Sequence, residues 1–431
     1  MKKCVLGDYI LDMASGPFGS NLKVECFVSS GFPIIDGANL YGVRVTDNVT
    51  KFVTEEKARS LSRSIAKRHD VIVTISGTLG QVAYIPSDSL YEEYLCSQRQ
   101  FRVTFDESKI DVEYLVNLLH TDYGQKKILS FANYVGVPAL SQPLPNFRRI
   151  ELELPDIEKQ HEIANIISTI DRKIALNRKR IATLEAMAKE IYDYWFVQFD
   201  FPDAHGRPYK SSGGAMVYNP DLKREIPKGW EVKPLADAVK ELNSGEWGSD
   251  ACGESSSVQV HCLRGADMED QSHLPVRYIS ERKADKLLNV GDIVIEMSGG
   301  SPTQATGRSC YVSQGLLDAY NGKLTCTNFC NSLKLKEPGE TSYFLFVWRM
   351  FYRAGLMFNF EGKTSGLKNL QIDSLLATKW VFPPKELVTK FNKLFLSSTA
   401  QTDNCKKEIS RLSDLRDFLL PVLMNGQVKV G

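Results

Sequence analysis

The feature that most constrains the fold of this chain is an internal repeat. When the two halves of the 431 residues are compared, short segments recur in the same order, as expected for a chain built from two copies of one plan. The clearest pair ends in proline in both copies, LELP at 152–155 and WVFP at 380–383, at an offset of 383 − 155 = 228. Chance could produce any one pair, but an ordered series predicts two domains of the same fold.

The other recurring segments place strands and helices at matching positions. Each copy has a valine- and isoleucine-rich strand that runs into Ser-Gly, then a polar strand start, and then an aromatic-rich helix. The pairs are 6–8 with 235–237, 35–40 with 263–268, 69–77 with 291–299, 96–100 with 326–330, and 112–119 with 343–352. We therefore predict two α/β domains.

A long heptad pattern follows the terminal proline of each copy. Steps of four and three are typical of a coiled-coil seam. In the first copy the seam is Ile163, Ile167, Ile170, Ile174, Asn177, Ile181, Leu184, Ala188, Ile191 and Trp195. In the second it is Phe391, Phe395, Ser398, Thr402, Cys405, Ile409, Leu412, Arg416, Leu419 and Leu423.

The length of these patterns favours paired rods over ordinary core helices, because core helices average only about 12 residues. Some forty residues at ~1.5 Å each would span roughly 60 Å, enough to separate two domains by more than one turn of DNA. The polar Asn177 would fix the register at a cost in stability. Between the first helix and the second domain, residues 202–230 contain several Gly, Ser and Pro residues and indicate an ordered but irregular linker.

Composition limits the possible functions. The 53 Lys and Arg residues balance 52 Asp and Glu residues, giving a net charge of +1, whereas domains that hold DNA alone usually carry a basic excess. This argues against an independent DNA binder, but not against a subunit whose partners share the phosphate contacts. The nine cysteines form no CxxC pair, and we see neither a signal peptide nor a membrane span. We expect a reducing cytoplasm.

The sequence lacks the usual parts of a self-contained DNA enzyme. An adenine methyltransferase needs an Asn/Asp-Pro-Pro-aromatic clamp, but NPDL at 219–222 and FPPK at 382–385 are wrong at essential positions. GKT at 362–364 resembles the end of a phosphate-binding loop, yet Met357 stands where its first glycine is required. We predict no catalytic residues.

Metal chemistry is also disfavoured. PDIEK at 155–159 resembles a nuclease motif but opens a helix, where carboxylates are ordinary caps. His261-Cys262 and the pair Cys326 and Cys330 could hold zinc only with ligands from elsewhere, and buried structural cysteine is the favoured explanation. We therefore predict no metal site.

The first helix and its exit carry the most specific motif. It runs from Gln160 through IDRKI at 170–174, NRKR at 177–180 and IYDYWFVQFD at 191–200, and continues with RPYKSSGG at 207–214 and IPKGWE at 226–231. This region resembles the central conserved region of specificity subunits of type I restriction-modification enzymes. The second helix departs from that pattern, with Lys390 to Lys393 where a Gln-rich start is common.

The resemblance implies a division of labour. Two target-recognition domains, 1–154 and 233–382, would each recognise half of a bipartite double-stranded DNA target. Two antiparallel helices, 155–201 and 383–431, would act as spacer and docking surface, with 202–232 as linker. Two modification subunits would methylate adenine with S-adenosylmethionine, and restriction subunits would add ATP- and Mg-dependent translocation and cleavage. This chain itself would bind no cofactor, metal or membrane.

Polar loops that recur in both halves are the candidate DNA contacts, because base recognition needs donors and acceptors that reach a groove. In the first domain these are Ser76, Gly77, Thr78, Gly80, Gln81, Gln98, Arg99, Gln100, Ser141 and Gln142. In the second they are Ser298, Ser301, Thr303, Gln304, Arg308, Thr327, Asn328, Lys363, Thr364, Ser365, Lys368 and Asn369. For the basic cluster Lys57, Arg59, Arg63, Lys67 and Arg68, a solvated helix face is favoured over phosphate binding.

Two alternatives remain at this point. A single-chain modification or cleavage enzyme would need a motif that we do not find. A non-catalytic coiled-coil scaffold would leave the repeated polar loops without a purpose.

Overall fold

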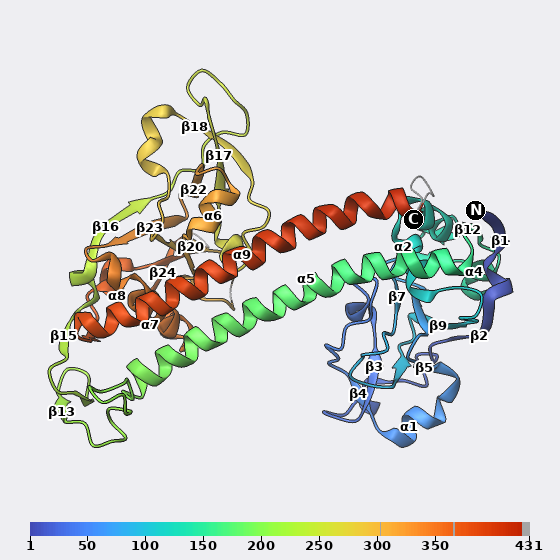
Figure 1. Ribbon diagram of the computed structural model, residues 1–431, viewed down its shortest axis with the longest axis horizontal. Coiled ribbons are helices and arrows are strands. Elements are labelled where there is room, and N and C mark those ends of the chain that lie inside the picture. The colour runs from blue at the N-terminus through green and yellow to red at the C-terminus, as the bar shows by residue number, and fades with distance from the viewer. Residues whose placement is uncertain (302, 365–366, 425–431) are drawn as a thin grey trace. The chain divides into compact units, whose positions relative to one another are not determined.

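The computed structural model describes residues 1–301, 303–364 and 367–424, which fold into two compact units. One unit comprises Met1–Lys173 with the chain from Arg411 onward, and the other comprises Ile174–Ser410. Each unit therefore contains one α/β domain and part of each long helix, α5 (Ile157–Tyr192) and α9 (Lys385–Met424) (Figure 1). Within the described part of the chain, no helix is both long and apolar enough to cross a membrane.

Two four-stranded sheets form the first domain. The antiparallel sheet has the order β2 (Ile10–Ser15), β9 (Gln100–Phe105), β6 (Val71–Thr74), β7 (Val82–Tyr84). The mixed sheet has the order β4 (Phe52–Val53), β3 (Phe32–Ile35), β8 (Glu93–Cys96), β5 (Ile65–Lys67), with β3 and β8 parallel. The remaining elements are β1 (Lys2–Val5) paired with β12 (Glu151–Leu154), the hairpin β10 (Ala132–Asn133) and β11 (Ala139–Leu140), and helices α1 (Glu55–Ser60), α2 (Val112–His120), α3 (Asp122–Leu129) and α4 (Pro143–Arg148).

The second domain repeats this plan. Its four-stranded antiparallel sheet has the order β16 (Val239–Ser244), β23 (Cys330–Leu335), β19 (Ile293–Glu296), β21 (Ser309–Tyr311). Beside it are β18 (Val276–Ile279), β17 (Val258–Leu263) and β22 (Leu324–Cys326), with β17 and β22 parallel. The other elements are β15 (Glu231–Pro234) with β26 (Lys379–Phe382), β20 (Ser298–Gly299) with β25 (Leu367–Leu370) and β24 (Glu361–Thr364), and helices α6 (Gln314–Ala319), α7 (Thr341–Arg353) and α8 (Ile372–Leu376).

The predicted α/β fold with two long helices is confirmed, and β12 and β26 keep the offset found in the sequence, 379 − 151 = 228. The segments at 96–100 and 326–330 prove to be turns that lead into strands β9 and β23. A glycine directly follows the strand that pairs with β9 or β23 in each copy: Gly16, after β2, donates from N to Gln100 O at 2.8 Å, and Gly245, after β16, donates from N to Cys330 O at 3.0 Å. An added Cβ would lie 1.8 Å from Ser97 O or 2.2 Å from Cys326 O, so both copies require glycine there.

The linker contains a hairpin that the sequence analysis did not predict, β13 (Met216–Asn219) with β14 (Arg224–Pro227). The first part of the linker folds back on the segment that follows the first helix. Asp200 of that segment accepts hydrogen bonds from the Ser211 amide at 2.7 Å and from the Ser211 hydroxyl. The Ser211 hydroxyl also holds the pKa of the Asp200 carboxyl below its usual range. The RPYKSSGG motif therefore closes a loop onto the end of the FVQFD motif.

The two long helices pack antiparallel. Within the second unit, Ser398 Oγ donates to Leu184 O at 3.4 Å, and Asn177 Nδ2 donates to Glu408 Oε2 at 2.8 Å. Within the first unit, Arg416 Nη1 lies 3.1 Å from Asp171 Oδ1. The buried seam positions are Ile163, Ile167, Ile170, Ile174, Asn177, Phe391, Phe395, Thr402, Cys405 and Leu423. The half-buried ones include Ile181, Leu184, Ile191, Trp195, Ile409, Leu412 and Leu419.

Aromatic side chains hold the end of α5 in the core of the second domain. Tyr192 stacks on Phe346 of α7 with ring centroids 5.1 Å apart. Phe196 lies 4.9 Å from Tyr343 and 5.2 Å from Phe391 of α9. Burying such rings stabilises a core through both apolar area and ring geometry. The aromatic motif noted in the sequence is thus the joint between both helices and this domain.

The polar middle of α9 is used by the second domain. Asp403 accepts from Ser313 Oγ at 2.8 Å and from Gly315 N at 3.0 Å, at the start of α6. A Cβ added at Gly315 would lie 2.4 Å from both Cβ and Cγ of Asp403. Asp403, which lies next to the seam position Thr402, therefore anchors α6 to α9.

Removing the seam hydrogen bond should destabilise the helix pair. Asn177→Ala deletes a donor to a carboxylate at a buried position, and we expect a loss of about 1.5–3 kcal/mol in the free energy of unfolding. Urea unfolding of the full chain measures it. Asn165→Ala, at an exposed position of the same helix, is the matched control and should change stability little. Equal effects of the two variants would contradict the assigned seam.

A larger side chain at the contact between α6 and α9 should also lower the stability of the fold. Gly315→Ala forces Asp403 away and should cost about 1–3 kcal/mol, as overpacking does. Gly339→Ala is the control, because only Thr389 Oγ1, 3.9 Å away, lies near its added Cβ. Thermal melting of both variants tests this; an unchanged midpoint for Gly315→Ala would show that α6 is not held by Asp403.

Candidate nucleic-acid interface

Backbone hydrogen bonds join three polar segments of the first domain. The glycine turn after β6 donates from Ile75 N to Arg99 O at 2.7 Å, which links it to the turn before β9. The same turn is linked to the β10–β11 hairpin, because Leu140 N donates to Ile75 O at 2.8 Å and Gly77 N donates to Pro138 O at 2.9 Å. Segments that are up to 65 residues apart (140 − 75) thus meet at one place.

The second domain makes the equivalent bonds. Met297 N donates to Phe329 O at 2.8 Å, and Leu370 N donates to Met297 O at 2.8 Å. Ser298 and Gly299 of β20 pair with Asn369 and Lys368 of β25. The glycine turn, the turn before the long strand and a hairpin therefore meet in both domains, and we call this set of three segments the candidate interface of each domain.

The predicted residues of the first domain divide into exposed and internal groups. Thr78, Gln98, Arg99, Ser141 and Gln142 are exposed, and Ser76 and Gly77 are half-buried. Gln100 is buried and accepts a hydrogen bond from Ser97, Gly80 is buried, and the Gln81 amide bonds inside the domain.

A similar division holds in the second domain. Thr303, Gln304 and Asn328 are exposed, and Ser298 and Ser301 are half-buried, with Ser298 Oγ bonded to Asn369. Thr327 is buried, while Arg308 and Lys368 form ion pairs with Glu296 and Glu361 at 2.7 and 3.1 Å. Lys363 and Thr364 belong to strand β24. Ser365 lies outside the described residues.

The tip of the first hairpin was missed by the sequence analysis. Tyr134, Val135 and Val137 are all strongly exposed, with Val135 the most exposed of the three. Their apolar character gave no signal of a DNA contact, because we searched for donors, acceptors and charge. The counterpart in the second domain, the β24–β25 hairpin, was included for its Lys and Thr residues.

One pair of equivalent positions in the sheets has a neutral hydrogen bond in the first domain and an ion pair in the second. Thr74 N donates to Gln81 O, and Glu296 N donates to Arg308 O, so these pairs occupy equivalent places in the sheet. The first pair is neutral, with Thr74 Oγ1 donating to Gln81 Oε1 at 3.1 Å. The second is a bidentate ion pair, with Arg308 Nε and Nη2 2.9 and 2.7 Å from the two Glu296 oxygens. The Glu296 carboxylate raises the pKa of the Arg308 guanidinium.

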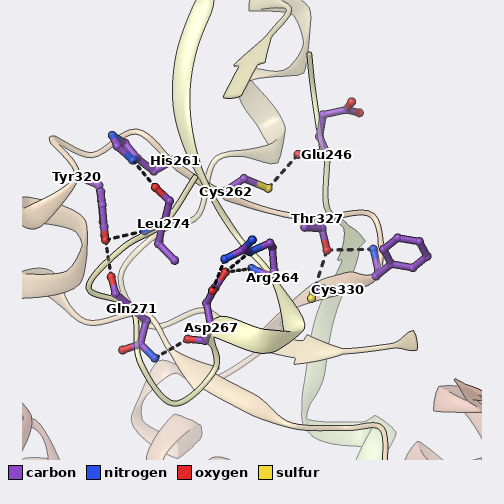
Figure 2. A network of polar contacts seen from close by, with 11 residues as sticks. Glu246, His261, Cys262, Arg264, Asp267, Gln271, Leu274, Tyr320, Thr327 and Cys330 are labelled. Atoms are coloured by element: carbon purple, nitrogen blue, oxygen red, sulfur yellow. Dashed lines mark hydrogen bonds and ion pairs between the residues drawn. The ribbon is translucent and has the colours of Figure 1, made fainter. Parts of the chain in front are cut away.

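The cysteine and histidine cluster considered for zinc is a packed network (Figure 2). His261 Nδ1 lies 3.4 Å from Leu274 O, and Cys262 Sγ donates to Glu246 O at 3.7 Å. Burial raises the pKa of the Cys262 thiol to about 12 and that of Cys330 to about 11, as expected for buried structural thiols. Among the described residues, no three His, Cys, Asp or Glu side chains form a group that could hold a metal ion.

Other motifs also have structural roles. Asp156 caps α5, since its Oδ1 accepts from Lys159 N at 3.0 Å, which confirms the expected helix cap. Of the basic cluster, Arg59 pairs with Glu55 and Glu93 at 2.8 and 2.6 Å, and Lys67 lies 3.6 Å from Glu93. These ion pairs favour the interpretation of the cluster as a solvated face.

The Glu296–Arg308 pair can be tested by a double-mutant cycle. Glu296→Thr leaves Arg308 partly buried without its carboxylate, and Arg308→Gln leaves the buried Glu296 charge without its cation; each should cost about 3–5 kcal/mol. The double variant installs the neutral pair of the first domain and should cost clearly less than the sum. Chemical unfolding measures all three. Strict additivity would contradict the coupling.

Comparison with known proteins agrees with this geometry. Residues 27–186 match the family model described as the type I restriction modification DNA specificity domain. The chain is 25% identical to the MjaIX specificity subunit of Methanocaldococcus jannaschii, a type I restriction enzyme subunit, over 88% of this chain and 82% of that protein. It is 24% identical to the HindI specificity subunit of Haemophilus influenzae, over 65% of this chain and 69% of that protein.

A solved structure shares the fold. The crystal structure of the type I restriction-modification system S subunit from M. genitalium aligns with a TM-score of 0.61 at 15% identity, covering 98% of this chain and 95% of that one. The family-model match, the relatives that extend over most of the chain and the repeated fold give one conclusion. Residues 27–186 match the type I restriction modification DNA specificity domain, and the chain is similar over most of its length to specificity subunits of type I restriction enzymes.

Proposed function

We propose that this chain recognises a bipartite double-stranded DNA target, one half with each domain. Residues 1–154 and 233–382 act as the two target-recognition domains, residues 155–201 and 383–431 as helical spacers, and residues 202–232 as the linker. The observation that carries the proposal is the repeated candidate interface, in which equivalent backbone bonds join equivalent polar segments. Two domains that recognise different half-sites need the same backbone scaffold with different side chains on the loops that contact DNA.

The exposed members of each candidate interface are the proposed contacts. Gln98 and Asn328 occupy equivalent turns, and their amides can each pair with an adenine edge, whereas Arg99 can contact guanine or phosphate. Thr78, Ser141 and Gln142 in the first domain, and Ser301, Thr303 and Gln304 in the second, would add hydrogen bonds to bases or backbone. The buried members, Gly80, Gln100 and Thr327, act by shaping the turns.

Partners supply the chemistry in this proposal. The similarity to specificity subunits of type I restriction enzymes supports assembly with other subunits and with DNA. We assign the outer faces of α5 and α9 to two modification subunits, because each helix has exposed apolar side chains, Leu176 and Met187 on α5 and Leu415 and Phe418 on α9. S-adenosylmethionine, ATP and Mg would bind to the partner subunits, with restriction subunits joining the complex in the cytoplasm.

Exchange of one domain tests the proposal. The chain is co-expressed with modification subunits of a type I system, and host DNA is sequenced for methylated adenine. Replacing residues 1–154 by the equivalent domain of a relative should change one half of a split motif and leave the other half unchanged. Replacing residues 233–382 should have the complementary effect.

The matched control is replacement of the linker hairpin, residues 216–227, which should leave the motif unchanged. Methylation that neither domain exchange alters would assign recognition to another subunit. Failure of the chain to footprint on any methylated motif in the assembled complex would favour the scaffold function instead.

A further inference from the structure

A cavity in the second domain is not explained by contact with base edges alone. It has a volume of about 560 Å³, and all three segments of the candidate interface line it, through Ser298, Asn328 and Leu367. Contacts to base edges in a groove require side chains that project from the surface. A hollow of this size lies instead in the range of sites that enclose a small ligand.

The walls of the cavity suit a flat ring. Trp247 and Phe329 both line it, and Phe329 is about half exposed. Arg277, which is not a lining residue, stacks over the Trp247 ring at 4.0 Å and donates to the backbone oxygens of Trp247 and Gly248 at 3.1 and 3.0 Å. The indole is thereby held in place before any ligand arrives, which lowers the entropic cost of stacking on it.

A carboxylate, that of Glu296, also lines the cavity. Glu296 is 4% exposed and has hydrogen-bonding capacity left, because Arg308 donates only one bond to each oxygen and a carboxylate can accept about four. A Cβ at Gly265 would lie 2.6 Å from Glu296 Oε1, and one at Gly299 would lie 3.2 Å from it. The two glycines therefore allow the backbone to approach the carboxylate closely.

The first domain fills the equivalent place with an amide. Gln81, the counterpart of Arg308, donates from Nε2 to Gly37 O at 3.1 Å, and its Oε1 lies 3.3 Å from where a Gly37 Cβ would be. Gly37 is the counterpart of Gly265 in the repeat. Thr74 and Gln81 of the first domain correspond to Glu296 and Arg308 of the second. The second domain therefore has a charged acceptor where the first has a neutral pair whose side chains hydrogen-bond within the domain.

We infer that this cavity receives one nucleobase turned out of the duplex in the second half-site. The ring stacks against Trp247 and Phe329, and an exocyclic amino group donates to Glu296. The site would therefore accept adenine, cytosine or guanine and reject thymine, which has no amino donor. This inference rests on the proposed function and assigns to one domain a mode of recognition beyond contacts in the groove.

Mismatches provide the test. The assembled complex of the full chain and its modification subunits binds duplexes that carry its methylation motif. Each pair of the second half-site is converted to a mismatch by changing only the base opposite an amino-bearing base. Because a mismatched base is easier to extrude, affinity should rise several-fold at one position other than the methylated adenine. Mismatches at the other positions of either half-site, the methylated adenines excepted, should be neutral or weaken binding about tenfold.

Two variants test whether the rise in affinity for a mismatched duplex depends on the cavity. Trp247→Ala should remove the gain and weaken binding of the matched duplex about tenfold, the effect of losing one stacking surface. The double variant Glu296→Thr with Arg308→Gln keeps a neutral pair in the fold and should remove the preference for an amino-bearing base. Tyr218→Ala, which removes an exposed aromatic outside the cavity, is the control and should leave affinity and the mismatch gain unchanged.

The outcomes separate the two proposals. Tight binding to the motif with no mismatch gain at any such position would overturn the nucleobase site and leave half-site recognition intact. Absence of motif-dependent binding would overturn the proposed function itself. If the mismatch gain is absent but adenosine or cytidine monophosphate binds the chain and Trp247→Ala abolishes that binding, the site takes a free nucleotide and its assignment to DNA is wrong.

Discussion

Neither long helix of this protein can bury its apolar stripe alone. A helix of this length with an apolar seam needs a partner, because intrinsic helix propensity contributes little compared with tertiary packing. Here the partner of α5 is α9, from the other end of the chain, and contacts such as Leu184 with Ser398 and Asp171 with Arg416 show the antiparallel pairing within each unit. The two α/β domains depend on this pairing, since each compact unit contains part of both helices.

The same helices also enter the cores of the domains. In the first unit, Leu423 and Met424 of α9 are buried in the cluster that contains Ile163 and Ile167 of α5. In the second unit, Tyr192 and Phe196 at the end of α5 pack on Phe391 at the start of α9 and on the rings of α7. Large ring contacts of this kind fix orientation as well as stability. The helices therefore continue the hydrophobic core of each domain.

The candidate interfaces of the two domains share their backbone arrangement and differ in their side chains. Both candidate interfaces use the same three segments and the same backbone bonds, yet Arg99 is replaced by Phe329, and the Thr74–Gln81 pair by Glu296–Arg308. A conserved backbone with variable tips lets one fold serve different ligands, because loops carry function while the scaffold carries stability. The second domain thus has an ion pair where the first has a neutral pair, and Glu296 of that ion pair lines the cavity.

The sequence by itself determined the repeat, the α/β class, the two long helices and the lack of a recognisable catalytic motif. All of these depend on periodicity or local pattern: heptads for α5 and α9, a Val- and Ile-rich run for β6 and β19, and an offset that β12 and β26 retain. Asn177 was also identified from its seam position, although its partner Glu408 lies 231 residues away. That partner depends on how the two helices are set against each other.

Only the tertiary structure decided which polar residues remain available. Gln100, Thr327, Arg308 and Lys368 look like contact residues in the sequence, but they are buried or use their polar groups in internal hydrogen bonds and ion pairs. The sequence could not show this, because hydrogen-bond partners distant in the chain satisfy polar groups without any local signal. The exposed tip of the β10–β11 hairpin was missed because its side chains are apolar. The cavity was hidden because it exists only where segments up to 120 residues apart (367 − 247) come together.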